Sequence, residues 1–145
     1  MIRELGHVVL KVRGLERSVR FYRDVLGLRE VARLHGQMAF FSAGEKHHDL
    51  AIMALGPGAP APAPDAVGLY HVAFKVGDSL GELRAAKARV EEHGIPILGM
   101  SDHTVAQSLY LADPDGNMVE LYVDADPAVW KSDPSAIASV RPLHL

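Results

Sequence analysis

The chain has 145 residues, 48% of them hydrophobic and 23% charged, which is enough to bury a core as one domain or as two small fused halves. Its net charge of −3 argues against a nucleic-acid partner, and no apolar run approaches the roughly 18 residues of a membrane span. The absence of cysteine excludes disulfides, thiolate metal sites and cysteine nucleophiles, whereas eight histidines could bind a metal beside carboxylates. The N-terminus has no apolar signal region, so we expect a cytoplasmic protein.

The chain contains one internal repeat, which is visible in two similar strand openings. Leu5–Val12 reads LGHVVLKV and Leu69–Val76 reads LYHVAFKV, so His7 and His71 occupy equivalent places 64 residues apart. Both segments are rich in apolar and β-branched residues, which favours strands. We therefore expect both halves to follow one plan.

In the first half, the opening strand is followed by a predicted helix that ends before Gly27. Its apolar residues recur with helical spacing at Leu15, Val19, Tyr22 and Leu26. Strand-forming segments then predict three further strands, at Arg29–Leu34, Gln37–Ser42 and His48–Met53. Residues 56–66, which are rich in proline, glycine and alanine, are predicted to be a linker.

In the second half, Ser79 is predicted to cap a helix that runs to about His93 and ends before Pro96. The expected buried stripe of this helix is Leu80, Leu83, Ala86 and Val90. Three more strands are predicted, at Ile97–Gly99, Ala106–Ala112 and Asn117–Val123. The DPDG sequence at 113–116 predicts the turn before the last of them.

The predicted fold class is α+β, with two βαβββ repeats that form a cupped mixed sheet and carry their helices on its convex side. Repeat one covers residues 4–55 and repeat two covers residues 67–123, so residues 1–123 make a single domain. The C-terminal tail, residues 124–145, contains Trp130 and is predicted to be a packing or dimer element.

Strand alternation places three metal-ligating residues on the face away from the helices. In the strand at 8–12 the even-numbered residues are apolar and would pack beneath the helix, which leaves His7 on the opposite face. The same alternation puts His71 and Glu120 on that face, together with Ser108 and Tyr110. A single such residue is usually exposed to solvent, but this set fits two imidazoles and one carboxylate around a divalent metal. That ligand set leaves positions open for a substrate and for oxygen.

Four blocks of sequence carry a family resemblance. The blocks are GHVVLKV at residues 6–12, RFYRDVLGL at 20–28, YHVAFKV at 70–76 and DPDGNMVEL at 113–121. Over about residues 4–123 the chain resembles the vicinal oxygen chelate superfamily. That superfamily includes glyoxalase I, extradiol dioxygenases, fosfomycin-resistance enzymes, methylmalonyl-CoA epimerase and bleomycin-binding proteins.

The resemblance implies a paired βαβββ fold, and it matches His7, His71 and Glu120 to the metal ligands of the family. It implies a divalent metal, with Fe(II) expected and Mn(II), Ni(II) or Zn(II) as alternatives. The fourth ligand position, which holds a carboxylate in glyoxalase I, corresponds either to Asp49 or to Ala51.

Further residues resemble those of the extradiol dioxygenases. His47–Ala51 (HHDLA) is similar to a stretch whose second histidine is the active-site acid/base, here His48. His103 and Tyr110 are similar to the histidine and tyrosine that donate hydrogen bonds to a substrate oxygen. Strand parity nevertheless places His48 on the helix-packed face, unless the strand begins after it or a bulge lies at Asp49. His47 is the alternative inward-facing residue.

The expected function is an extradiol-type dioxygenase that cleaves a catechol with Fe(II) and O2, binding this small molecule through its two adjacent oxygens. The alternatives are a glyoxalase- or epimerase-like isomerase or lyase, a fosfomycin-type thiol transferase, and a non-catalytic bleomycin-type binding protein. We expect a homodimer, in which the repeats pair either within a chain or between chains.

Overall fold

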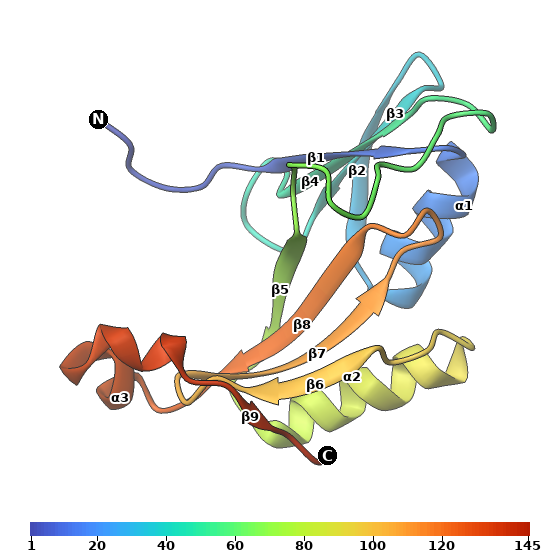
Figure 1. Cartoon of the computed structure of the whole chain (residues 1–145). Helices are drawn as coiled ribbons and strands as arrows, with labels where there is room; N and C mark the ends of the chain where they lie inside the picture. Colours follow the sequence, from blue (N-terminus) through green and yellow to red (C-terminus); the bar gives the residue numbers. More distant parts are fainter. The chain divides into compact units, whose positions relative to one another are not determined.

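The two similar strand openings each begin a separate mixed β-sheet in the computed structural model, which describes all 145 residues (Figure 1). The chain divides into two compact units. Unit 1 comprises Met1–Gly68 and Asp113–Asn117, and unit 2 comprises Leu69–Ala112 and Met118–Leu145. The predicted α+β class is confirmed, and each unit contains the predicted βαβββ order.

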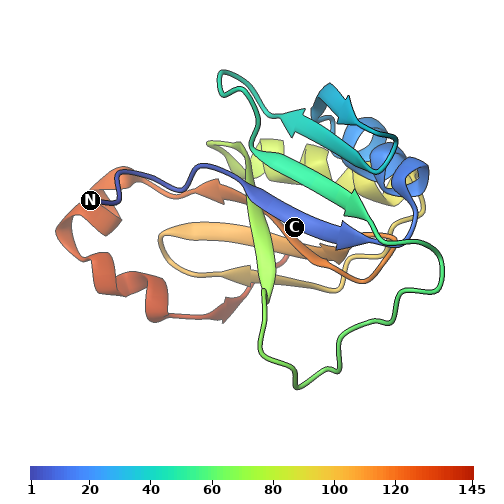
Figure 2. The ribbon, with the colours of Figure 1, turned by 90° about the horizontal axis from the view of Figure 1, so that it is seen from above.

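Unit 1 holds a four-stranded sheet in the order β1-β4-β3-β2, in which β1 and β4 are parallel and the other pairs are antiparallel. Its elements are β1 (Val8–Val12), α1 (Leu15–Val19), the helical turn η1 (Arg20–Val25), β2 (Arg29–Leu34), β3 (Met38–Ser42) and β4 (Leu50–Ala54). Leu10 and Val12 are buried whereas Val9 and Lys11 are exposed, as the alternation predicts. Figure 2 shows the linker after β4 as a loop (green) without helix or strand.

The first predicted helix is split by a wider π-type turn. After α1, the N–H of Leu26 donates to the carbonyl of Phe21, five residues back instead of four. The wider turn rotates the end of the helix, so Val25 is buried in place of the predicted Leu26. Gly27 ends the helix with φ +82°, a conformation that glycine adopts without strain.

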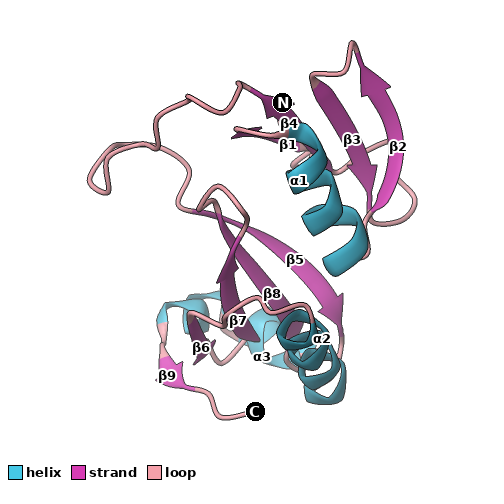
Figure 3. Cartoon of the chain, turned by 90° about the vertical axis from the view of Figure 1, so that its right-hand side faces the viewer, coloured by secondary structure: helices cyan, strands magenta, loops and turns pink.

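Unit 2 holds a five-stranded sheet in the order β5-β8-β7-β6-β9, with β5 and β8 parallel. Its elements are β5 (His71–Gly77), α2 (Leu80–Glu92), β6 (Gly99–Asp102), β7 (Ala106–Ala112), β8 (Met118–Asp124), α3 (Pro127–Ser132), the 3-10 turn η2 (Pro134–Ala138) and β9 (Arg141–Pro142). In Figure 3, α1 and α2 (cyan) each lie beside the strands of their own unit (magenta). None of the helices is both long and apolar enough to cross a membrane.

The predicted cap of α2 is confirmed, because the Ser79 side chain accepts a hydrogen bond from the N–H of Glu82. Two predictions for this half are wrong. Leu80 is exposed, and the strand predicted at Ile97–Gly99 instead runs over Gly99–Asp102. The reason for the second error is pairing, since Gly99 lies opposite Tyr110 and Ser101 lies opposite Ser108. The β7 hairpin partner, and not local β-propensity, sets the position of β6.

The DPDG turn belongs to unit 1, although the strands that it connects belong to unit 2. The buried Asp113 carboxylate accepts hydrogen bonds from the Tyr22 hydroxyl (2.9 Å), the Asn117 amide side chain (2.8 Å) and two backbone N–H groups. Asp115 in turn binds the Arg13 and Arg17 guanidinium groups. Burial, followed by the neighbouring Asp113 charge and its hydrogen bond, raises the pKa of Tyr22. Tyr22 therefore stays protonated and donates to Asp113.

We predict that Tyr22→Phe lowers the free energy of unfolding by about 1–2 kcal/mol, because the buried Asp113 carboxylate loses one of its donors. Tyr122→Phe is the matched control, since Tyr122 is only partly buried, and we expect a change of less than about 0.5 kcal/mol. Urea unfolding of both variants measures the difference. Equal stability of the two variants would contradict the role given to the Tyr22–Asp113 bond.

Candidate metal-binding and catalytic site

In unit 2, strand register brings His71, Glu120 and Tyr110 together. Parallel β5 and β8 pair Ala73 with Glu120, and antiparallel β7 and β8 pair Tyr110 with Glu120. Side chains two residues apart share one face of a strand, so His71 lies on the same face as Ala73 and reaches Glu120 diagonally. The His71 Nε2 atom lies 2.9 Å from Oε2 of Glu120.

Glu120 is a buried carboxylate whose two oxygens are both occupied. Its residue exposure is 9%, Oε1 accepts a hydrogen bond from the Ser108 hydroxyl, and the Tyr110 hydroxyl lies 3.4 Å from the same oxygen. A carboxylate removed from water needs such partners, because its charge is costly to bury alone. The contacts fix Glu120 with Oε2 toward His71.

The Nδ1 atom of His71 is buried and has no hydrogen-bond partner. The other ring nitrogen, Nε2, faces the buried Glu120 carboxylate, and this imidazole and carboxylate form a donor set suited to divalent iron, manganese or zinc. The separation of the facing N and O atoms also matches two neighbouring ligands of one ion, which lie about 3 Å apart for bonds of about 2.1 Å at a right angle. The residues present therefore fit a divalent metal ion.

The structure brings together two of the three predicted ligands. No group of three or more His, Asp or Glu side chains is positioned to hold a metal ion. His7 belongs to unit 1, whereas His71 and Glu120 belong to unit 2. The complete ligand set of His7, His71 and Glu120 stays a prediction.

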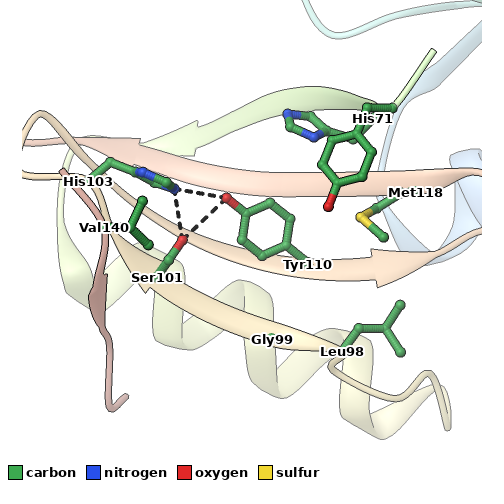
Figure 4. A pocket seen from close by; sticks show the side chains of 9 residues that line it. His71, Leu98, Gly99, Ser101, His103, Tyr110, Met118 and Val140 are labelled. Atoms are coloured by element: carbon green, nitrogen blue, oxygen red, sulfur yellow. Dashed lines mark hydrogen bonds between the residues drawn. The ribbon is translucent and has the colours of Figure 1, made fainter. Parts of the chain in front are cut away.

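A pocket of about 450 Å³ is lined in part by His71, the partner of Glu120 (Figure 4). Its lining is Tyr70, His71, Leu98, Gly99, Ser101, His103, Tyr110, Met118 and Val140. The pocket is largely apolar, and its polar groups gather near His71 and around Tyr110. Such a pocket can accept an aromatic ring and direct its polar substituents toward the metal-binding pair.

Two predicted polar residues meet at this pocket, joined by a serine that the sequence reading missed. His103 Nε2 lies 3.0 Å from the Tyr110 hydroxyl and 2.9 Å from the Ser101 hydroxyl, and Ser101 donates to Tyr110 at 3.2 Å (Figure 4). Ser101 was overlooked because its strand was predicted two residues too early. The sequence pattern places Ser108 on the correct face but assigns it no role. Its hydrogen bond to Glu120 is visible only once the register of β7 and β8 is known.

The remaining predicted residue, His48, lies beside His7 in unit 1. Strand β4 begins at Leu50, so His48 precedes the strand, and the alternation of strand faces does not apply to it. Its ring centroid lies 4.3 Å from that of His7 and 5.5 Å from that of Phe40. Burial, and then the neighbouring His7 and His47, lower the pKa of His48. A neutral imidazole beside a predicted metal ligand can accept a proton at neutral pH.

The strand register also shows whether Asp49 or Ala51 is the counterpart of Glu120 in the first repeat. In unit 2, Ala73 pairs with Glu120, and in unit 1 its repeat equivalent Val9 pairs with Ala51. Ala51 is thus the counterpart of Glu120, and this position has no carboxylate. The Asp49 carboxylate instead accepts a hydrogen bond from the N–H of Ala43 at 2.7 Å.

Comparison with known families gives one match that covers most of the chain. Residues 4–121 match the model of the Glyoxalase/Bleomycin resistance protein/Dioxygenase superfamily. Among solved structures, a lactoylglutathione lyase from Agrobacterium tumefaciens is similar, with a TM-score of 0.66 and 30% identity. That similarity covers 88% of this chain and 96% of the other.

Two dioxygenases are similar in sequence. The chain is 39% identical over 130 residues to catechol-2,3-dioxygenase of Bacillus subtilis (strain 168), which covers 89% of this chain and 44% of the relative. It is 39% identical over 121 residues to biphenyl-2,3-diol 1,2-dioxygenase 3 of Rhodococcus globerulus, which covers 83% of this chain and 63% of the relative. The chain thus spans less than two thirds of the length of either dioxygenase.

We predict that His71→Ala abolishes stoichiometric metal binding, because the substitution removes an imidazole and leaves the buried Glu120 carboxylate without its partner. His144→Ala, at an exposed position outside the pocket, is the control and should keep the metal content of the unaltered protein. Elemental analysis after anaerobic loading with Fe(II) measures both. Full metal content in His71→Ala would remove His71 from the ligand set.

Proposed function

Because the chain belongs to the Glyoxalase/Bleomycin resistance protein/Dioxygenase superfamily, we propose that it is an extradiol-type dioxygenase that cleaves the ring of a catechol with Fe(II) and O2. The observation that carries the proposal is the His71–Glu120 pair at the edge of a largely apolar pocket that also presents Tyr110 and His103. The similarity to two dioxygenases of aromatic diols supports the choice within the superfamily.

His71 and Glu120, together with His7, would hold the metal ion. An Fe(II) ion in such a site, with positions left open, supplies a centre at which a diol and O2 can react. Ser108 keeps the Glu120 carboxylate oriented, so the carboxylate presents one oxygen toward His71. Precise orientation of a ligand by its neighbours raises metal affinity and activity.

The pocket residues would orient the substrate and handle its protons. Leu98, Met118 and Val140 provide an apolar wall for the ring. Tyr110 and His103 form a hydrogen-bonded pair within reach of a substrate oxygen in the pocket. His48 in unit 1, whose lowered pKa favours the neutral form, is the proposed proton acceptor and donor.

A glyoxalase-type site has less support in this chain. The position equivalent to Glu120 in the first repeat is Ala51, so no carboxylate stands there as a fourth ligand or as a base. Asp49 is engaged by the backbone of its own loop. A site with three protein ligands therefore fits the residues better than a site with four.

The direct test supplies the Fe(II)-loaded chain with a panel of catechols, including biphenyl-type diols, and follows oxygen consumption and the yellow ring-cleaved product. We expect turnover that requires both iron and oxygen. The glutathione adduct of methylglyoxal with Ni(II) or Zn(II), and fosfomycin with a thiol and Mn(II), are the comparison assays. The proposal would be overturned if no catechol is cleaved while either comparison assay shows turnover.

Tyr110→Phe is predicted to lower kcat by about a hundredfold, because the hydroxyl proposed to contact the reacting oxygen is lost. Tyr122→Phe, a tyrosine of β8 outside the pocket, is expected to keep the activity of the unaltered protein. Metal content is measured for both variants, so that a loss of iron is not mistaken for a loss of chemistry. Unchanged kcat in Tyr110→Phe at full iron content would contradict the role of Tyr110.

A homodimer is also proposed, on the basis of the family resemblance. Size-exclusion chromatography with light scattering should give about twice the 15.7 kDa mass of the chain. A monomer at full activity would contradict this proposal.

A further inference from the structure

Of the C-terminal tail, the residues that follow β8 are 125–145, and apart from the pocket-lining Val140 they have no role in the proposed function, yet they pack against the loop that carries His103. Neither α3 nor η2 contributes a buried residue. The tail is instead attached through β9, which pairs Pro142 with Ser101 and Arg141 with Asp102. Figure 1 shows β9 beside β6 at the edge of the second sheet. Contacts of the tail therefore concentrate around Asp102–Thr104.

The tail reaches His103 through a backbone carbonyl. The Nδ1 atom of His103 lies 3.2 Å from the carbonyl oxygen of Ser139. A carbonyl oxygen can only accept a hydrogen bond, so Nδ1 must carry the proton for this contact to form. In the neutral imidazole, Nε2 then has no proton and acts as an acceptor.

This assignment sets the direction of the hydrogen bonds around Tyr110. Nε2 of His103 lies 3.0 Å from the Tyr110 hydroxyl, which is closer than the 3.4 Å between that hydroxyl and Glu120. The Ser101 hydroxyl lies 2.9 Å from Nε2 but gives its one proton to the Tyr110 oxygen, so the acceptor Nε2 takes the proton of Tyr110. Ser101 donates to the Tyr110 oxygen at 3.2 Å, and the second lone pair of that oxygen stays available to the pocket.

Side chains of the tail also stabilise the backbone next to His103. Thr104 has φ +70°, a conformation that is unfavourable for a β-branched residue. Such a conformation persists only where the surroundings impose it. Thr104 Oγ1 bonds the Ser139 hydroxyl and accepts from the Arg141 guanidinium at 3.1 Å, while its N–H donates to Asp102 at 2.6 Å. Ser139 and Arg141 thus hold the turn that orients the His103 ring.

We propose that Ser139 and Arg141 are positioning residues, through which the tail fixes His103 in the Nδ1-protonated form and turns the Tyr110 hydroxyl into a hydrogen-bond acceptor for a substrate hydroxyl. The part that concerns the substrate rests on the proposed function. It also revises the expectation from sequence, in which Tyr110 and His103 both donate to the substrate oxygen. When its imidazole is neutral, His103 acts on the substrate only through Tyr110 and Ser101.

The first experiment reads the tautomer directly and needs no turnover. The full chain, labelled with ¹⁵N and loaded with diamagnetic Zn(II), is studied by NMR at about two pH units above the ordinary imidazole pKa of about 6.5. The His103 signals are assigned by their absence in His103→Gln. We expect a proton on Nδ1 and none on Nε2. A proton on Nε2, or an even mixture of the two forms, would overturn the proposal.

The second experiment combines Ser139→Ala with Arg141→Ala, which removes the side-chain contacts of the tail to Thr104 and leaves the Ser139 carbonyl present but no longer held beside His103. We expect the Nε2-protonated form to become detectable and kcat to fall about tenfold or more at unchanged metal content. Lys131→Ala, which removes a charge from the same tail without touching this loop, should do neither. Arg141→Gln alone serves as a milder variant if the double variant folds poorly.

A double-mutant cycle separates positioning from general stability. In a His103→Gln background, the two tail substitutions should change kcat by less than about twofold, because the group that they orient is gone. An equal loss in both backgrounds would show a merely structural role and overturn the proposal. If no catechol is turned over, the proposed function fails, but the NMR experiment still decides the tautomer.

Discussion

The carboxylate of Glu120 constrains the arrangement of unit 2, because a buried charge must find partners. The groups beside it come from different strands: His71 from β5, and the donor Ser108 and the neighbouring Tyr110 from β7. The pairing of β8 between β5 and β7 is therefore what builds the site. A slip of one residue in either register would turn Glu120 or its partners to the helix-packed face. The apolar residues Val119, Leu121 and Val123 hold the register, since they fill the core on that face.

The two repeats share one plan but differ in chemistry. Where unit 2 pairs Tyr110 with Glu120, the equivalent pair in unit 1 is Phe40 with Ala51. Unit 1 thus offers no carboxylate at this place, and the proposed site residues His7 and His48 lie in the chain just before β1 and β4. The result is a duplicated scaffold whose proposed acidic ligand comes from the second repeat alone. This asymmetry favours a metal site with open positions over one closed by a fourth protein ligand.

The sequence predicts those parts of the molecule that depend on local pattern. Strands β2 and β7, the Ser79 cap and the inward faces of β1 and β8 are confirmed because period-two alternation and capping chemistry act over a few residues. His71, Glu120 and Tyr110 could be placed on one face for the same reason. Ser101 and Ser139 could not be predicted, because the first depends on the register of a hairpin and the second on a contact 36 residues away from His103.

The central claim is that this chain inserts both atoms of O2 into a catechol at a site built on His71 and Glu120. A single turnover in isotopically labelled dioxygen tests it most directly. Protein loaded with Fe(II) and saturated with a catechol under anaerobic conditions is exposed to the labelled gas, and the product is analysed by mass spectrometry. The account predicts a ring-cleaved product that carries two labelled oxygen atoms, formed in proportion to bound iron and absent in Glu120→Gln. An unchanged catechol, or a product with a single labelled atom, would contradict it.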